Sequence, residues 1–112
     1  MSQLRARSKI WLEIDGQAVL GRGRLVLLEA VERNGSISAA ARDLEISYRK
    51  AWSQLAEMDK QLPFPLLERK VGGKGGGMTR LTPQTREIMA QFRQLLDGSK
   101  EFVDHRFAEV FK

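Results

Sequence analysis

The sequence predicts a mostly α-helical domain with a small amount of β structure. Three patterns carry this prediction: an N-terminal segment with alternating apolar residues, four segments with helical apolar spacing, and a glycine-rich loop between two short apolar runs. The 112 residues are 42% hydrophobic and 29% charged, which suits one soluble domain with a packable core. The expected order is a strand hairpin, three helices, a two-stranded hairpin and a long helix.

The first expected element is a hairpin from Ser8 to Leu20. Its apolar residues alternate along the first strand, as they do in a strand with one covered face. Asp15-Gly16 then supplies a two-residue turn, in which both residues take positive φ angles. We expect this hairpin to be structural.

A first helix is expected from Arg24 to Asn34. Leu25, Leu28 and Val31 recur at helical spacing, so they form one apolar face. Gly35 follows at the position where a left-handed residue ends a helix.

Two further helices are expected in close succession. Ser36 can cap a short second helix with Ala40, Ala41 and Leu44 facing inward, and the helix breaks at Glu45-Ile46.

Ser47 can cap a third helix, which runs to about Leu62 and is stopped by the two prolines that follow. The shared apolar face of this helix contains Ala51, Leu55, Met58 and Leu62.

The unit from Ser36 to Leu62 has the composition of a helix-turn-helix. Alanines at 39–41 and 51 let the two helices approach closely. At about 100° per residue, Arg49 and Ser53 lie opposite the apolar face, with Lys50 and Gln54 at its flank. An arginine there can bond both acceptors of a guanine edge, and serine or glutamine can bond bases or phosphates. The alternative is an ordinary αα-hairpin with a solvated polar face.

Two aromatic residues belong to the same helix. Tyr48 and Trp52 could contact a thymine methyl group or a sugar, or they could be part of the core. Trp52 lies about 100° from the apolar centre, which favours partial burial against the second hairpin or the first helix.

Two runs, Pro65 to Val71 and Met78 to Leu81, predict a second hairpin, or wing. Its tip, residues 72–77, holds five glycines and Lys74. A phosphate loop of a nucleotide-binding enzyme does not fit, because the lysine precedes the last glycines instead of following them into a helix. Glycines beside a cation suit close approach to a phosphate backbone. A tip without a partner is the alternative.

Thr82 can cap a final helix with Pro83 at its first position. The apolar stripe of this helix runs for some seven turns, which favours a dimerisation helix. The alternative is that the helix packs along the first helix as ordinary core, which could hold in part for Ile88 and Phe92. The expected domains are a DNA-binding unit over 1–83 and a dimerisation helix over 84–112. The expected dimer contacts are Phe92, Leu95, Leu96, Val103 and Phe107.

Charge and composition restrict the function. The net charge is +5, and residues 69–86 contain five bases and no acid, which favours a polyanionic partner. The chain has no cysteine, and its one histidine, His105, suits a surface role. No set of nucleophile, base and orienting residue can be assembled, so we expect no enzyme, metal or cofactor. No apolar run approaches about 18 residues, so we expect a cytoplasmic protein with no membrane partner.

Three motifs carry a resemblance: residues 35–41 (GSISAAA), 47–52 (SYRKAW) and 72–83 (GGKGGGMTRLTP). Together they resemble the N-terminal DNA-binding domain of the ModE family of molybdate-dependent transcription regulators, over roughly residues 8–96, and more distantly the LysR-type helix-turn-helix. The resemblance implies a winged helix-turn-helix fold, a homodimer, and base contacts from the helix beginning at Ser47. Thr85 stands where relatives usually have glycine, a difference expected to affect only the start of the last helix.

We therefore expect a homodimeric, sequence-specific regulator that binds double-stranded DNA. A protein-interaction or RNA-binding winged helix is the alternative. The molybdate-binding modules of ModE proper do not follow the resembling region, so no molybdate binding is expected. The expected DNA-binding residues are Ser36, Ser38, Ser47, Tyr48, Arg49, Lys50, Ser53, Gln54, Lys70, Lys74 and Arg80.

Overall fold

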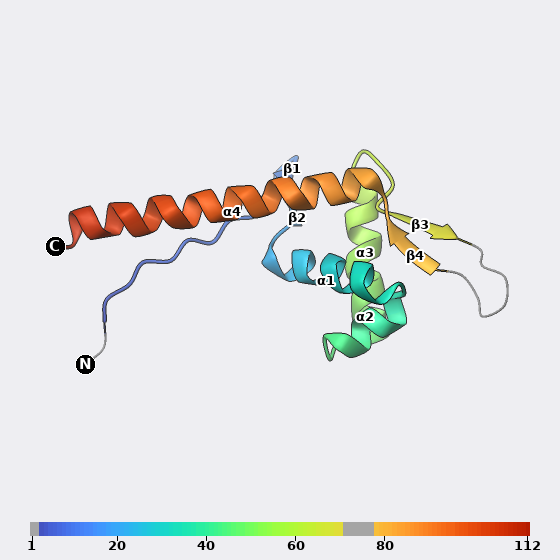
Figure 1. Cartoon of the computed structure of the whole chain (residues 1–112). Coiled ribbons are helices and arrows are strands. Elements are labelled where there is room, and N and C mark those ends of the chain that lie inside the picture. The colour runs from blue at the N-terminus through green and yellow to red at the C-terminus, as the bar shows by residue number, and fades with distance from the viewer. Residues whose placement is uncertain (1–2, 71–77) are drawn as a thin grey trace.

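The computed structural model describes residues 3–70 and 78–112. Within them the chain forms two two-stranded antiparallel sheets and a set of helices (Figure 1). In chain order the elements are β1 (Leu12–Ile14), β2 (Gln17–Leu20), α1 (Arg22–Asn34), α2 (Ile37–Asp43), α3 (Tyr48–Gln61), β3 (Leu67–Lys70), β4 (Met78–Leu81) and α4 (Pro83–Val110). This is the predicted order, and the fold is a winged helix-turn-helix.

The N-terminal hairpin is shorter than expected but turns where predicted. Asp15 and Gly16 have φ angles of 52° and 78°, as a two-residue turn with two positive φ angles requires. The hairpin is held to the helices by two side chains. Arg24 donates to the Val19 carbonyl at 2.8 Å, and Gln61 donates to the Ala18 carbonyl at 3.1 Å.

Helix α1 begins two residues earlier than expected, with Gly21 as its N-cap. It ends at Gly35, whose φ of 72° is left-handed, and the Gly35 amide donates to the Val31 carbonyl at 2.8 Å. Leu27, Leu28, Ala30 and Val31 of α1 are almost completely buried. Helix α1 is therefore central to the core.

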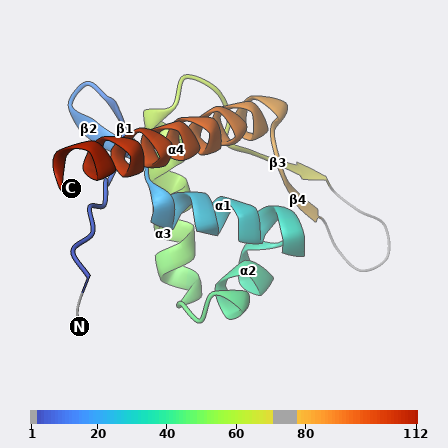
Figure 2. The ribbon, with the colours of Figure 1, turned by 60° about the vertical axis from the view of Figure 1, so that its left-hand side comes forward.

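One hydrophobic core joins all the helices. It contains the apolar face of α1, Ala40 and Ala41 of α2, and the predicted α3 residues Ala51, Leu55 and Met58. Figure 2 shows α1 lying between α4 on one side and α2 on the other. The buried alanines of α2 and α3 are 0–3% exposed, so small side chains sit where these two helices meet.

The wing consists of β3, β4 and the segment between them, and it pairs from Leu67↔Leu81 to Lys70↔Met78. The amide of Thr79 donates to the Gly35 carbonyl at 2.9 Å, which links β4 to the end of α1. Residues 71–77, with the predicted Lys74, lie outside the described residues.

Helix α4 has two parts that differ in surroundings. Met89, Phe92 and Leu96 pack in the common core at 1%, 1% and 9% exposed, whereas the later turns project away from it (Figures 1 and 2). The protein is accordingly elongated, at 62 × 34 × 20 Å, with a radius of gyration of 17.3 Å against about 13 Å for a compact domain of about 100 residues.

This placement corrects two expectations about α4. Phe92 and Leu96 are covered by the chain's own core, so they cannot serve a dimer contact as well. The winged unit also extends past residue 83, because the first half of α4 completes its core. No helix within residues 3–70 and 78–112 is both long and apolar enough to cross a bilayer.

Candidate nucleic-acid interface

The connection from α2 to α3 is tight, and local hydrogen bonds define it. Glu45 takes a left-handed φ of 55°, which turns the chain between α2 and α3. The Leu44 amide donates to the Ala40 carbonyl and the Ile46 amide donates to the Ala41 carbonyl, both at 3.0 Å. These bonds satisfy carbonyls at the end of α2 and fix the angle at which α3 begins.

A serine side chain caps the N-terminus of each of these two helices. The Ser36 hydroxyl accepts from the Ala39 amide and the Ser47 hydroxyl accepts from the Lys50 amide, each at 3.0 Å. Each hydroxyl still has its own proton to donate to a phosphate or a base. Ser38 is exposed on α2 and has no capping role.

The face of α3 away from the core is polar and open. Arg49, Lys50 and Ser53 are exposed, and Gln54 is half-buried beside them, as the helical periodicity predicts. Tyr48 and Trp52 are each 51% exposed. Trp52 is thus covered over only half of its surface, and both rings are open to a ligand.

The distribution of ion pairs separates two groups of bases. On α1 and α4, Arg24, Arg33, Arg86 and Arg93 each pair with a carboxylate at 3.4 Å or less. Within the described residues, Arg49, Lys50 and Arg80 form no ion pair. The charges of Arg49, Lys50 and Arg80 are therefore not paired within the part of the chain that the structure describes, and they favour an anionic ligand.

The strands of the wing place its bases on both of its faces. Arg80 lies opposite Glu68 and Arg69 lies opposite Thr79, and all these side chains except the half-buried Thr79 are exposed. Lys70 ends β3 opposite Met78. Arg80 and Lys70 are both among the predicted DNA contacts.

Two exposed bases near these elements are absent from the predicted contacts. Arg69 follows from the pairing register of the wing, and Arg42 lies in the last turn of α2. Within the described residues neither forms an ion pair. A strand register cannot be read from a single hairpin sequence with a long loop, so only the cluster of bases in 69–86 pointed to Arg69.

A polar clamp holds α2 against the end of α1. Asp43 accepts from Arg33 Nε at 3.0 Å and from Asn34 Nδ2 at 2.9 Å. The hydrogen bonds from Asn34 and Arg33, with the charge of Arg33, hold the pKa of Asp43 below its ordinary value of 3.8. This contact joins the end of α1 to the end of α2 and orients the first helix of the helix-turn-helix.

The projecting half of α4 exposes a second surface, which is apolar. Leu95, Phe102, Val110 and Phe111 are 45–70% exposed, and Phe107 stacks on Phe111 with ring centroids 4.8 Å apart. The predicted contacts Val103 and Phe107 are half-buried. This surface is a candidate for protein contact and is separate from the polar face of α3. Within the described residues, no group of three or more metal-binding side chains comes together.

Comparison with known proteins agrees with this arrangement. The DNA-binding transcriptional dual regulator ModE of Escherichia coli K12 is 34% identical over 97 residues, or 81% of this chain and 37% of that protein. The molybdenum transport protein ModE of Azotobacter vinelandii is 40% identical over 95 residues, which is 85% of this chain and 35% of that protein. The transcriptional regulator ModE of Haemophilus influenzae is 42% identical over 82 residues, which is 73% of this chain and 32% of that protein. The chain spans about a third of the length of these relatives.

Solved structures with the same fold include two DNA complexes. The CbnR_DBD–DNA complex has a TM-score of 0.57 at 25% identity and covers 78% of this chain and 94% of its own. The complex of BenM_DBD with benA site 1 DNA has a TM-score of 0.54 at 24% identity, and the match covers 79% of this chain and 96% of that chain. The family model described as the bacterial regulatory helix-turn-helix protein of the lysR family matches residues 23–86. Since that match runs from α1 through the wing into α4, more than half of the chain, this protein belongs to the bacterial regulatory helix-turn-helix proteins of the lysR family.

Proposed function

We propose that this protein is a sequence-specific regulator of transcription that binds double-stranded DNA. The observation that supports this most strongly is the open face of α3, where Arg49, Lys50 and Ser53 are exposed on a capped helix. Within the described residues neither base is paired with a carboxylate. The two neighbouring structures are complexes with DNA, and one of the relatives is named as a DNA-binding transcriptional regulator.

The two basic elements have different roles in this proposal. A helix fits the major groove, where the planar fork of Arg49 can bond O6 and N7 of a guanine. The wing, with Lys70, Lys74 and Arg80, contacts phosphates, which position the protein without reading sequence. Ser36, Ser38 and Ser47 lie at the starts of α2 and α3. In this proposal their hydroxyl groups add contacts to the DNA phosphates.

We also propose that the protein acts as a homodimer through the second half of α4. The support is the exposed apolar surface of that half, which includes Phe102 and Val110 and which water does not solvate well. Two copies related by a two-fold axis would read two half-sites of a palindrome.

A protein-docking function is the second candidate, and Tyr48 and Trp52 are the observation that favours it. Both rings are 51% exposed on α3, and aromatic side chains are frequent anchors at protein interfaces. In the DNA-binding proposal the same rings contact thymine methyl groups or sugars.

Selection from random duplex DNA at physiological salt tests the proposal and separates the candidates. We expect enrichment of one motif with two-fold symmetry. Competition with a structured RNA and with random duplex is the control. A selection that enriches no sequence, or RNA that competes better than the selected duplex, would contradict the proposal.

The remaining parts of the proposal follow from DNA as the ligand. Transcription regulation needs no catalytic site or cofactor in this chain, and it takes place in the cytoplasm, where a bacterial chromosome lies. The absence of molybdate binding by these residues stays a prediction, which calorimetry with sulfate as competitor can check.

A further inference from the structure

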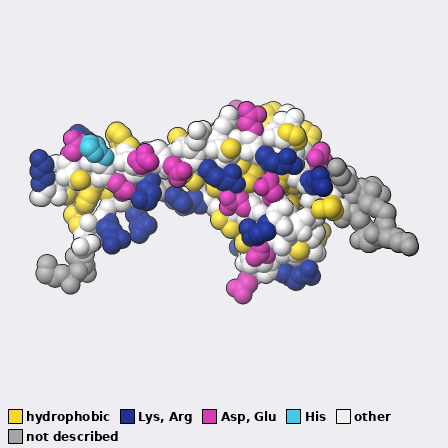
Figure 3. All heavy atoms as spheres, in the orientation of Figure 1, with side chains coloured by type: hydrophobic (Ala, Val, Ile, Leu, Met, Phe, Trp, Pro, Cys, Tyr) yellow, Lys and Arg dark blue, Asp and Glu magenta, His cyan; other side chains and the backbone are white. Residues whose placement is uncertain are grey.

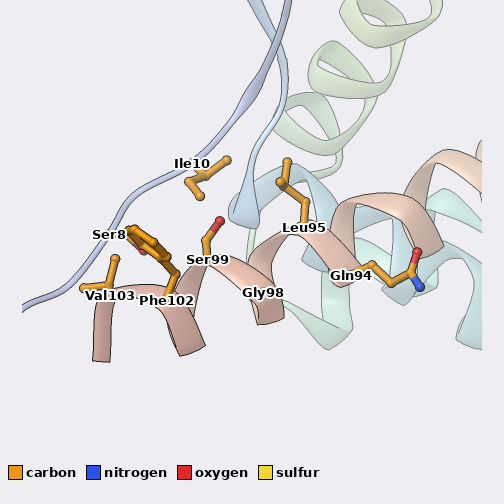
Figure 4. A pocket seen from close by; sticks show the side chains of 8 residues that line it. All are labelled: Ser8, Ile10, Gln94, Leu95, Gly98, Ser99, Phe102 and Val103. Atoms are coloured by element: carbon orange, nitrogen blue, oxygen red, sulfur yellow. The ribbon is translucent and has the colours of Figure 1, made fainter. Parts of the chain in front are cut away.

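The N-terminal segment, residues 3–11, contains no helix or strand; it begins to diverge from the underside of the projecting half of α4 before residue 8 and lies further from the helix toward its N-terminal end (Figure 1). Ser8 and Ile10 point toward the helix and form a groove with it (Figure 4). The helix side of that groove consists of Gln94, Leu95, Gly98, Ser99, Phe102 and Val103. Successive side chains of an extended chain point to opposite sides, which places Ser8 and Ile10 together on the side that faces α4.

The bases of the segment, Arg5, Arg7 and Lys9, do not line this groove. All three are exposed, and within the described residues none forms a hydrogen bond or an ion pair. The first twelve residues of the sequence contain no acid. The segment therefore presents a row of three uncompensated positive charges.

The neighbouring bases of α4 behave differently. Arg93 pairs with Glu29 at 2.9 Å, and Lys100 pairs with Asp104 at 2.9 Å. Helix α4 is thus close to electrically neutral around these pairs, whereas the segment beside it is strongly basic. The charge of the segment is available for an external polyanion.

The segment lies on the same side of α4 as the helix-turn-helix. Below α4 in Figures 1 and 2 lie the N-terminal segment, α2 and the beginning of α3. Figure 3 shows Lys and Arg side chains gathered under the projecting half of α4, where this segment runs. A duplex that meets α3 from this side can continue under the segment.

We propose that residues 3–11 form a second DNA-contacting element, in which Arg5, Arg7 and Lys9 bind phosphates outside the bases that α3 reads. This rests on the proposed function. The three side chains span about 13 Å at about 3.3 Å per residue, and one DNA strand carries a charge about every 3.4 Å along the axis. Each cation can therefore meet a separate phosphate.

The test uses the full chain and a fluorescent duplex that contains the selected site, measured by anisotropy across a series of salt concentrations. The variant is R5Q, R7Q and K9Q together. Removal of one cation from a phosphate reduces the slope of log K against log salt by about 0.9, so the expected reduction is about 2.7 per protomer. Affinity falls by the same factor for the selected site and for unrelated duplex, because phosphates carry no sequence.

Two control variants keep the result interpretable. K60Q, R106Q and K112Q together remove the same net charge outside this segment and are expected to leave the slope nearly unchanged. R5K with R7K preserves the charges and is expected to keep the wild-type slope, because lysine also binds phosphate. Equal thermal midpoints of all variants show that the exposed substitutions leave the fold intact.

The outcomes distinguish this inference from the proposed function. A wild-type protein that binds no duplex at any salt concentration would contradict the proposed function itself. If the wild type binds and the variant of residues 5, 7 and 9 keeps the wild-type slope, the segment does not contact DNA. The inference also fails if the control of residues 60, 106 and 112 lowers the slope equally, or if the segment variant changes the preferred base. Tighter binding of the full chain to anionic vesicles than to duplex would assign the segment to a membrane surface instead.

Discussion

Two threonine side chains join the end of the wing to the start of α4. Thr82 Oγ1 donates to the Pro65 carbonyl at 2.7 Å and also accepts from the Thr85 amide at 3.2 Å as the helix cap. Thr85 Oγ1 donates to the Leu66 carbonyl at 2.8 Å and is completely buried. Thr85 was expected to affect only how the last helix begins, but its hydroxyl also ties that helix to the chain segment before β3.

Replacing Thr85 by valine removes this hydroxyl and keeps the shape of the side chain. We expect the free energy of unfolding to fall by about 1 kcal/mol, since the variant lacks the buried hydroxyl contacts to the Leu66 carbonyl and to Thr82 Oγ1, while the Thr82 amide still bonds the Leu66 carbonyl. Denaturant unfolding measures the change. The exposed change Gln84→Ala serves as control, and an unchanged midpoint for Thr85→Val would show that the buried hydroxyl contributes nothing.

Asp43 predicts a dependence of stability on acid pH. Its pKa in the folded protein is lowered by hydrogen bonds from Asn34 and Arg33, so folding favours the charged form. The stabilisation is complete above the ordinary pKa of 3.8 and is lost as pH falls through the lower folded value. The difference in unfolding free energy between wild type and Asp43→Asn should therefore be constant near neutral pH and shrink below about pH 4. A carboxyl of Asp43 that titrates by NMR at or above 3.8 would contradict this interpretation.

At the scale of elements, α3 and the wing both expose positively charged side chains, but the backbone that carries them is a helix packed on the core in α3 and a short two-stranded hairpin in the wing. Helix α3 is capped by Ser47 and supported from beneath by buried Ala51 and Leu55, so its outer side chains start from a rigid base. The described part of the wing is only four paired residues on each strand. A rigid helix suits base reading, which requires aligned hydrogen bonds, whereas contact with a phosphate tolerates variation in position.

This difference predicts two distinct mutant phenotypes. Arg49→Ala should lose about 1–3 kcal/mol of discrimination at one position of each half-site, because a bidentate contact to guanine is removed. Arg80→Ala or Lys74→Ala should weaken binding to all sequences and reduce the salt slope by about 0.9. Binding to the selected site and its single-base variants across a salt series measures both effects. Equal weakening on every base variant for Arg49→Ala, or a changed base preference for Arg80→Ala, would reverse these roles.

At the scale of the whole molecule, α4 is longer than the core it covers. It has 28 residues and extends for about 42 Å at about 1.5 Å per residue. Phe92, Leu96 and Val103 fall within about 40° of one another around the helix at about 100° per residue. The same apolar stripe is therefore core near its start and surface near its end, and the exposed part is what a second copy would cover.

The dimer prediction is tested with Phe102→Glu and Phe107→Glu together. Both residues lie past the core, whereas Leu96→Glu would bury a charge in the core and unfold the chain. We expect a monomer by light scattering at micromolar concentration, with the helical content of the folded winged unit retained by circular dichroism. Gln84→Glu with Gln91→Glu adds the same charge on exposed sites of the first half of α4 and should remain a dimer. A dimer mass for the phenylalanine variant would refute this interface.

Local features of this protein follow from its sequence alone. Caps at Ser36, Ser47 and Thr82 and the left-handed Gly35 are all predicted correctly, because each depends on residues within a few positions along the chain. The polar outer face of α3 is also predicted, since helical periodicity places residues on faces without any knowledge of the partner.

Which part of each face is covered depends on the tertiary packing. Periodicity makes Phe92, Leu95 and Leu96 equivalent candidates for a dimer contact, yet Phe92 and Leu96 are buried and Leu95 is 45% exposed. The bonds of Asp43 to α1 and of Thr85 to Leu66 likewise join residues from different segments. A hydrophobic pattern indicates that a face must leave water, but only the packing of distant segments determines whether its own core or another molecule covers it.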